Sequence, residues 1–230
     1  DAMLKTARHL GRNLSGPPRR VGRVHLRLGS IAIERGEYLL AEAMLERAVA
    51  QAKRSGGRKD LNQALGELAL ARRWRGQAED SSRLLVEVIR HAANIGDRLL
   101  QATCYCNLAD VWFDELRLDH ARLALDKALE LSRGIVSADL DLDIRNIEIM
   151  LTIELKDTCI SQSLFPAIQE LIRHVSDAIS VGWALRTMAV AAVRVGDHRL
   201  AARSCADSVR HFAEIGSLGS LLRSLEVSAS

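Results

Sequence analysis

Three aspartates occupy alternate positions in the segment Asp139-Leu-Asp-Leu-Asp143. Oxygen-bearing residues at alternate loop positions are the ligands that an EF-hand uses for calcium, together with a glycine at position 6 and a bidentate glutamate at position 12. Ile144 and Met150 stand at those two places in this chain. We therefore predict the acidic first turn of a helix, where the helix dipole favours negative charge, rather than a metal site.

Cysteine and histidine side chains are the other candidates for chemistry. Cys104 and Cys106 are two residues apart on a predicted helix and point in different directions, so they are poorly placed to bind one ion together. The seven histidines are scattered, and no two of them have the i, i+4 spacing of helical metal ligands. We expect no bound metal and no cofactor.

Motifs that are typical of enzymes are missing from the sequence. It contains no glycine-rich phosphate loop, no H-E-x-x-H zinc motif, no G-x-S-x-G nucleophile motif and no dinucleotide-binding fingerprint. The sequence therefore predicts a protein without catalytic activity. The weaker alternative is an enzyme whose site involves residues 136–177, the most degenerate of the five sequence repeats described below. Its candidate residues are Asp110, Asp114 and Glu154.

The elements that position these residues are copies of one unit, which is best preserved in residues 25–48. A turn marker returns every 40 residues along the chain, and it is glycine at three of its five places. The five marker positions are Gly36, Gly76, Leu116, Lys156 and Gly196. A fixed spacing of this kind indicates repeats, each made of two antiparallel helices joined by a short turn.

The repeats predict a single solenoid over residues 1–230. It begins with a partial repeat in residues 1–16 and ends with the start of a further repeat in residues 218–230. The five full repeats are 21–57, 58–97, 98–135, 136–177 and 178–217. Because repeat arrays usually end in polar caps, the half repeats at both ends predict that the chain is a fragment of a longer protein.

Composition and charge limit the class of protein. Hydrophobic residues make up 48% of the chain and aromatic residues only 3%, which suits a helical core of small and branched aliphatic side chains. No apolar run approaches the ~18 residues of a membrane span, and four cysteines are too few for a disulfide scaffold, so we expect a cytoplasmic protein.

Residues 1–75 carry 16 lysines and arginines against 7 acidic residues, whereas residues 76–230 carry 16 lysines and arginines against 22 acidic residues. The basic third lacks an aromatic stacking set, so nucleic-acid binding is not expected there.

The packing positions of each unit resemble those of the tetratricopeptide repeat. The pair Leu28-Gly29 looks like the Leu-Gly pair in the first helix of that repeat, and similar pairs return at 68, 108 and 188. A small residue follows thirteen positions later and a large apolar residue four positions after that. The small residues are Ala41, Ser81, Ala121, Ser161 and Ala201, and the large ones are Leu45, Leu85, Leu125, Phe165 and Cys205. The resemblance implies an all-α, right-handed α-solenoid of antiparallel helix pairs, a superhelix of the tetratricopeptide type.

Each unit is about six residues longer than the usual 34-residue repeat of this family. This long-helix variety is similar to the solenoids of bacterial signalling proteins, among them large LuxR-type activators, antibiotic-pathway regulators and peptide-sensing regulators. The resemblance implies a non-catalytic module that binds a protein, a peptide or a small signal molecule. It would serve as the sensing or interaction domain of a bacterial transcriptional regulator or signalling protein, with a linked effector domain. The alternative is a structural adaptor or self-assembling scaffold, possible as a homo-oligomer.

In this family the first helix of each pair lines the concave surface, so the resemblance also implies the ligand-binding residues. They are Arg23, Arg27, Gln63, Arg73, Trp74, Asn107, Asp110, Asp114, Asp143, Asn146, Glu154, Trp183, Arg186 and Arg194. Cys106 is expected on the same surface, which makes it the better candidate for a reactive thiol, whereas Cys205 is expected in the core. The alternative for the two tryptophans is that they pack against neighbouring repeats.

Overall fold

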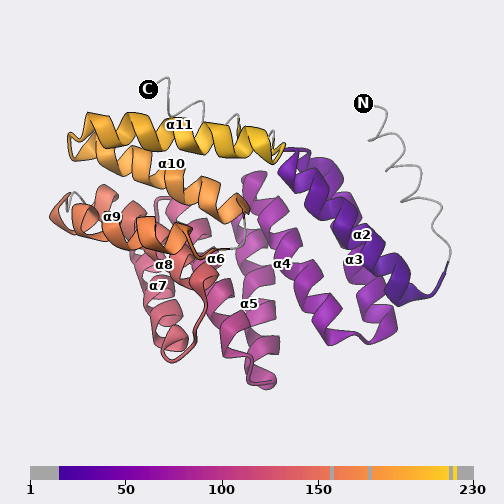
Figure 1. Ribbon diagram of the computed structural model, residues 1–230. Helices are drawn as coiled ribbons and strands as arrows, with labels where there is room; N and C mark the ends of the chain where they lie inside the picture. Colours follow the sequence, from indigo (N-terminus) through magenta and orange to yellow (C-terminus); the bar gives the residue numbers. More distant parts are fainter. Residues whose placement is uncertain (1–15, 156–157, 176–177, 218–219, 222–230) are drawn as a thin grey trace. The chain divides into compact units, whose positions relative to one another are not determined.

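The computed structural model describes residues 16–155, 158–175, 178–217 and 220–221, and these residues form helices joined by short turns (Figure 1). The helices are α2 (Pro18–Glu34), α3 (Tyr38–Ser55), α4 (Arg58–Trp74), α5 (Ala78–Asn94), α6 (Arg98–Asp114), α7 (Leu118–Ser132), α8 (Ala138–Glu154), α9 (Thr158–Ile172), α10 (Ala178–Arg194) and α11 (His198–Glu214). Within the described ranges there is no strand, and no helix is long and apolar enough to cross a membrane. The predicted all-α fold is confirmed. The two predicted half repeats lie outside the described residues, apart from Gly16, Ser220 and Leu221.

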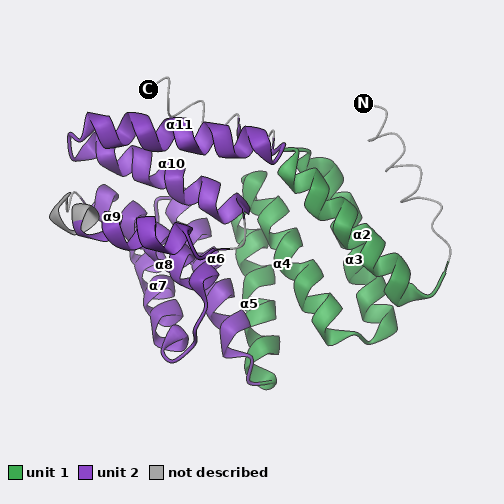
Figure 2. Ribbon diagram, viewed as in Figure 1, with its two compact units in different colours: residues 1–95 green, residues 96–230 purple. Residues whose placement is uncertain are grey.

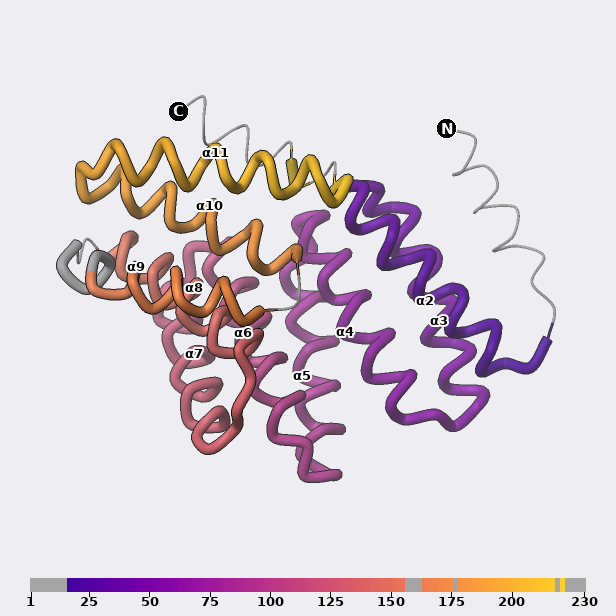
Figure 3. Tube along the Cα trace, in the orientation of Figure 1, coloured from indigo at the N-terminus to yellow at the C-terminus, as the bar shows by residue number. Residues whose placement is uncertain are grey.

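The chain divides into two compact units, residues 1–95 and residues 96–230 (Figure 2). Unit 1 contains α2 to α5, and unit 2 contains α6 to α11. Consecutive helices pack antiparallel in the pairs α2–α3, α4–α5, α6–α7, α8–α9 and α10–α11. The first helices of neighbouring pairs also touch, α2 with α4 in unit 1, and α6 with α8 and α8 with α10 in unit 2 (Figure 3). This is the arrangement of an α-solenoid, and it places the first helices side by side within each unit.

Small residues let the two helices of a pair approach closely. Ala41, Ser81 and Ala121 stand at the predicted small positions and have no exposed surface (0%). Leu45 and Leu125, at the predicted large positions, are equally buried (0%). Ser81 satisfies its buried hydroxyl by donating a hydrogen bond to the carbonyl oxygen of Ala69 at 2.8 Å. The packing positions read from the sequence therefore correspond to real helix contacts in these pairs.

The predicted core position of Cys205 is wrong. Its side chain is only half-buried. The large buried residue of α11 is Phe212, which is 0% exposed and lies seven residues, or about two helical turns, further along the helix. Phe212 packs against α10 at Gly182, where the missing side chain makes room for its ring. The fifth pair is therefore held together further along α11 than the repeat pattern predicts.

The turn inside most pairs uses left-handed backbone. Gly36, Gly76 and Gly196 have φ angles of 75°, 72° and 80°. Leu116 stands at the equivalent place with a φ of 57°, a conformation that costs a residue with a Cβ atom about 1–2 kcal/mol. Its side chain is 73% exposed, so burial returns little of that cost. Lys156, the remaining marker, lies outside the described residues.

Replacing Leu116 with glycine should raise the free energy of unfolding by about 1 kcal/mol, because glycine adopts the left-handed conformation without strain. Urea denaturation followed by circular dichroism measures the change. A matched control is Leu123→Gly, at a similarly exposed leucine (65%) inside α7, which should lower stability by about 1 kcal/mol. Loss of stability in both variants would contradict the left-handed turn at Leu116.

Candidate ligand-binding faces

The contact between α2 and α4 in unit 1 carries charged side chains. Glu67 of α4 is half-buried, within interaction range of Arg27, Ser30 and Glu34 of α2. Burial raises the pKa of the Glu67 carboxyl and the charge of Glu34 raises it further, whereas the Ser30 hydroxyl and the Arg27 charge act in the opposite direction. Gln63 is exposed one helical turn before Glu67. We call these five residues the α2–α4 face.

Replacing Glu67 with glutamine should make the protein more stable at neutral pH. A carboxyl whose pKa is raised by folding binds more protons in the folded state, so it costs stability as the pH rises above its unfolded pKa of about 4.3. The amide of glutamine carries no such cost. Thermal unfolding across the acidic and neutral range should show the advantage of Glu67→Gln disappearing as the pH falls below the unfolded pKa. Glu79→Gln, at an exposed position of α5, controls for the loss of one negative charge. An advantage that grows on acidification would contradict the prediction.

The predicted residues Arg73 and Trp74 lie at the C-terminal end of α4. Trp74 is half-buried and stacks on Tyr38 of α3, with ring centroids 6.4 Å apart and an interplanar angle of 26°. The Arg73 guanidinium lies 4.8 Å from the centroid of the same indole, a cation–π distance. Trp74 therefore packs against α3 of the neighbouring helix pair, within unit 1. It lies at the turn end of α4 rather than beside Glu67.

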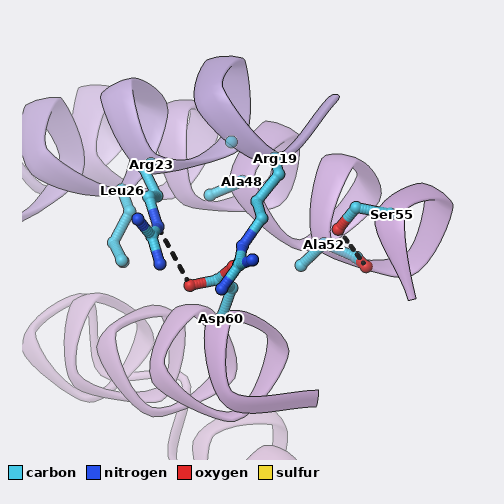
Figure 4. A pocket seen from close by; sticks show the side chains of 8 residues that line it. Arg19, Arg23, Leu26, Ala48, Ala52, Ser55 and Asp60 are labelled. Atoms are coloured by element: carbon cyan, nitrogen blue, oxygen red, sulfur yellow. Dashed lines mark hydrogen bonds and ion pairs between the residues drawn. The ribbon is translucent and has the colours of Figure 1, made fainter. Parts of the chain in front are cut away.

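Arg23 contacts the start of α4 (Figure 4). Asp60 accepts a hydrogen bond from Nε of Arg23 at 3.2 Å and another from Nε of Arg19 at 3.0 Å. Burial tends to raise the pKa of Asp60, but the two arginines outweigh it and hold this pKa below its ordinary value. The pocket beside them, lined also by Ala48 and Ala52, has a volume of about 10 Å³, room for about one water molecule. Asp60 thus ties α2 to α4. An open hollow of about 590 Å³ lies along the neighbouring surface of α2, lined by Arg19, Arg20, Arg23 and Arg27 among others.

In unit 2, Asp110 of α6 and Asp143 of α8 lie within electrostatic range of the same thiol, that of Cys106. Burial raises the pKa of Cys106 well above its ordinary value, and the charges of Asp143 and Asp110 raise it further. Both aspartates are half-buried, as are Asn107 next to Cys106 and Asn146 one turn after Asp143. We call Asn107, Asp110, Asp143 and Asn146 the α6–α8 face. The structure therefore brings together four of the predicted ligand-binding residues.

The expectation that Cys106 faces a ligand is wrong. Its side chain is 1% exposed, and that of Cys104 is 3% exposed. Burial raises the pKa of Cys104 to about 12, and a thiol that stays protonated is a poor nucleophile. The physical reason is that α6 is packed by both α7 and α8, so that positions two residues apart are covered by different helices.

Asn146 has a buried side-chain oxygen, Oδ1, that accepts no hydrogen bond from any of the described residues. A buried polar atom without a partner costs free energy, which a ligand N–H group would recover. Within the α6–α8 face this acceptor stands one helical turn from the Asp143 carboxylate.

On α10, the predicted residues Trp183 and Arg186 are half-buried. Trp183 meets Phe212 edge to face, with ring centroids 5.4 Å apart, and the Arg186 guanidinium lies 5.5 Å from the centroid of its ring. Trp112 of α6 has a similar neighbour, because the Arg117 guanidinium lies 4.2 Å from its ring centroid. Each tryptophan therefore packs beside an arginine and an aromatic or imidazole ring of its own unit.

Three predicted residues stand apart from the α6–α8 face. Asp114, Glu154 and Arg194 are exposed, and they are the last residues of α6, α8 and α10. They mark the turn end of the first helices in unit 2.

The two acidic members of the α2–α4 face, Glu34 and Glu67, were not predicted from the sequence. Glu34 lies seven residues after Arg27, and Glu67 lies four residues after Gln63. Both spacings keep a residue on the same stripe of a helix, so helical periodicity extended from the predicted residues would have found them.

The aspartates of the segment 139–143 lie near the beginning of α8. Asp139 and Asp141 lie in its first turn, and the side chain of Ser137 caps the helix by accepting a hydrogen bond from the backbone N–H of Leu140 at 3.3 Å. The predicted acidic first turn is confirmed. Among the described residues, no three histidines, cysteines or acidic residues are grouped so that they could hold a metal ion.

No family model matches the sequence, and a search of curated protein sequences finds no match either. Solved structures, in contrast, include similar folds. The apo form of RapI matches with a TM-score of 0.71 at 10% identity, covering 99% of this chain and 90% of that one. A Rap protein complexed with competence and sporulation factor matches with a TM-score of 0.67 at 8% identity, covering 98% and 69%. A putative kinesin light chain from Podosopora anserina with nearly identical TPR-like repeats matches with a TM-score of 0.58 at 15% identity, covering 88% and 99%. These similarities confirm the tetratricopeptide-like helical-repeat fold.

Proposed function

We propose that this chain is a protein- or peptide-binding module of the tetratricopeptide type, which receives its partner on the first helices of its pairs. The observation that carries the proposal is the gathering of half-buried charged side chains on these helices in both units, Glu67 in the α2–α4 face and Asp110 with Asp143 in the α6–α8 face. Partly desolvated charges cost free energy in the free protein, and they interact more strongly with a complementary partner than fully exposed charges do.

The chemistry of the α6–α8 face favours a positively charged group. Asp110 and Asp143 are two carboxylates whose charges act on the same buried thiol, and the Asn146 oxygen adds a hydrogen-bond acceptor. A lysine, an arginine or the amino terminus of a peptide presents the N–H donors that such a set accepts. The α2–α4 face carries both signs, with Arg27 near Glu34 and Glu67, so it suits a mixed polar segment.

We propose binding without catalysis. The described thiols of α6 are buried, with pKa values raised by that burial, so neither face gains a thiolate nucleophile from them. The carboxylates of the two faces can attract positive charge and accept hydrogen bonds, which are the interactions of a binding surface.

We further propose that the module is the sensing or interaction domain of a bacterial transcriptional regulator or cytoplasmic signalling protein. The support is its fold similarity to RapI and to the Rap protein that was solved with competence and sporulation factor. A ligand that contacts neighbouring first helices changes the rotation between pairs, and a linked effector domain receives that change. The complete gene product tests this part, since a gene without any effector domain beside the repeats would contradict it.

Peptide selection followed by titration tests the binding proposal. Random peptides displayed on phage are selected on the purified chain, and a selected peptide is titrated calorimetrically against the wild type, Asp143→Asn and Glu67→Gln. We expect at least one of these variants to bind about tenfold more weakly, because each removes a partly buried charge. Asp126→Asn, an exposed carboxylate of α7, is the matched control and should bind like the wild type. The proposal is contradicted if the selection yields no peptide. It is also contradicted if the selected peptide loses affinity only for the control variant, Asp126→Asn.

A further inference from the structure

One end of unit 1 is strongly basic. The left-handed Gly56 reverses the chain there, so the last turn of α3 stands next to the first turn of α4. Hydrogen bonds from Arg19 and Arg23 to Asp60 hold the start of α2 beside them (Figure 4). The seven basic residues of these turns are Arg19, Arg20, Arg23, Lys53, Arg54, Arg58 and Lys59. We call them the basic end.

In the described part of unit 1, few acidic residues accompany the basic end. In the segments 18–24 and 52–61 the sole acidic residue is Asp60. The opposite end of the unit is different, because there Arg72 donates to Glu42 at 3.1 Å and to Glu46 at 3.0 Å. Arg75 pairs with Glu42 as well. The unit therefore neutralises its charges at one end and leaves an excess of positive charge at the other.

The basic end is open to solvent. All seven of its residues are exposed, and the side chains of Arg19 and Arg23 remain 65% and 59% exposed even in their ion pairs with Asp60. Two helices, α2 and α4, also begin at this end, and the N-terminal ends of helices add positive potential. A solvent-exposed excess of like charge attracts a partner of the opposite sign.

The arrangement at Asp60 shows which anion fits. Its carboxylate is held between two guanidinium groups, each donating through Nε. Five of the seven residues of the basic end are arginines, whose planar forks of N–H donors match carboxylates in two-point contacts. The segments 18–24 and 52–61 contain no aromatic residue, so they lack the stacking platform that binds single-stranded nucleic acid.

We infer that the basic end is a docking surface for an acidic segment of a protein partner, rich in aspartate and glutamate. The pocket beside Asp60 has room for about one water molecule, whereas the open hollow lined by Arg19, Arg20 and Arg23 has a volume of about 590 Å³ and gives the acidic side chains a place to lie. The basic end shares no residue with the α2–α4 and α6–α8 faces, and the inference stands without the function proposed for them.

Fluorescence anisotropy with a labelled glutamate-rich peptide tests the inference. The wild type should bind this peptide, more weakly at higher salt, and should not bind the same peptide with glutamine in place of glutamate. The variant Arg20→Glu/Arg58→Glu reverses two charges in the first turns of α2 and α4, where glutamate is compatible with the helix dipole, so the fold should persist. We expect its affinity for the peptide to fall by about tenfold or more. If this variant fails to fold, the milder Arg54→Gln/Lys59→Gln measures the same surface.

The matched control is Arg199→Glu/Arg203→Glu on α11, which changes the net charge equally at two exposed arginines of unit 2. It should alter the affinity by no more than about twofold, because the inference assigns the peptide to the basic end of unit 1, to which these two arginines do not belong. An equal loss in the control would show attraction by overall charge and overturn the inference. Competition by duplex DNA or by phosphatidylserine vesicles that is stronger than competition by unlabelled peptide, and is lost in Arg20→Glu/Arg58→Glu, would assign the surface to a different occupant.

Discussion

Replacing Gly29 with alanine is expected to lower the free energy of unfolding by about 2 kcal/mol, the cost of forcing a group into a filled core. A Cβ atom at this position would stand 2.5 Å from Cγ and 2.7 Å from Cδ2 of Leu45. Leu45 is completely buried (0%), so its side chain has little freedom to move away. Guanidinium denaturation followed by circular dichroism measures the loss.

Gly66 provides the matched control, because it also lies inside a helix but a Cβ atom there would meet nothing within 4 Å. Gly66→Ala should raise stability by about 1 kcal/mol through the better helix propensity of alanine. The two glycine substitutions are thus expected to have opposite signs. A gain in stability for Gly29→Ala as well would contradict the close approach of α2 and α3.

Replacing Phe212 with alanine should destabilise unit 2 by about 4 kcal/mol, because it empties a large buried volume. The ring is 0% exposed, lies edge-on to Trp183, and fills the space over Gly182, where a Cβ atom would come within 2.5 Å of it. Denaturation followed by the emission of Trp183 and the other tryptophans reports the loss. Leu123→Ala, a truncation at an exposed position, should change stability by less than about 0.5 kcal/mol.

A double-mutant cycle tests the assigned contact directly. Gly182→Ala should be costly in the wild type, where its methyl group meets the ring, and much less costly in the Phe212→Ala background, where the space is empty. Additive effects of the two substitutions would show that Phe212 does not pack over Gly182.

The repeat pattern predicts the contacts within a pair well and the contacts among three helices poorly. Ala41 and Leu45 are buried as the pattern indicates, because a residue on the inner stripe of a pair always faces its partner helix. Cys106 lies on a stripe that the pattern assigns to a ligand, yet α7 and α8 together cover it. Glu67 escaped prediction for the same reason, since its half-buried state depends on α2 as well as on its own pair.

The turn positions show the same division. The 40-residue spacing predicts that Leu116 replaces a glycine, and the structure confirms that it sits in the turn. Its left-handed φ of 57° follows from the two flanking helices, which force the connection between them whatever residue occupies it. The 40-residue spacing shows where the turn lies in the sequence, whereas the φ angle of Leu116 shows how much conformational free energy the turn costs.

By itself, the sequence determined the all-α class, the pairing of helices and the residues packed inside most pairs, because these depend on side-chain size at fixed helical intervals. It also indicated the excess of basic residues toward the N-terminus. The tertiary structure decided which candidate residues come within electrostatic range of one another: Asp110 and Asp143 act on the same thiol, Arg27 acts on Glu67, and seven cations gather at one end of unit 1. These groups contain residues from helices of different pairs. The placement of one pair against the next depends on how whole helices pack, and the spacing of residues along the sequence does not specify that packing.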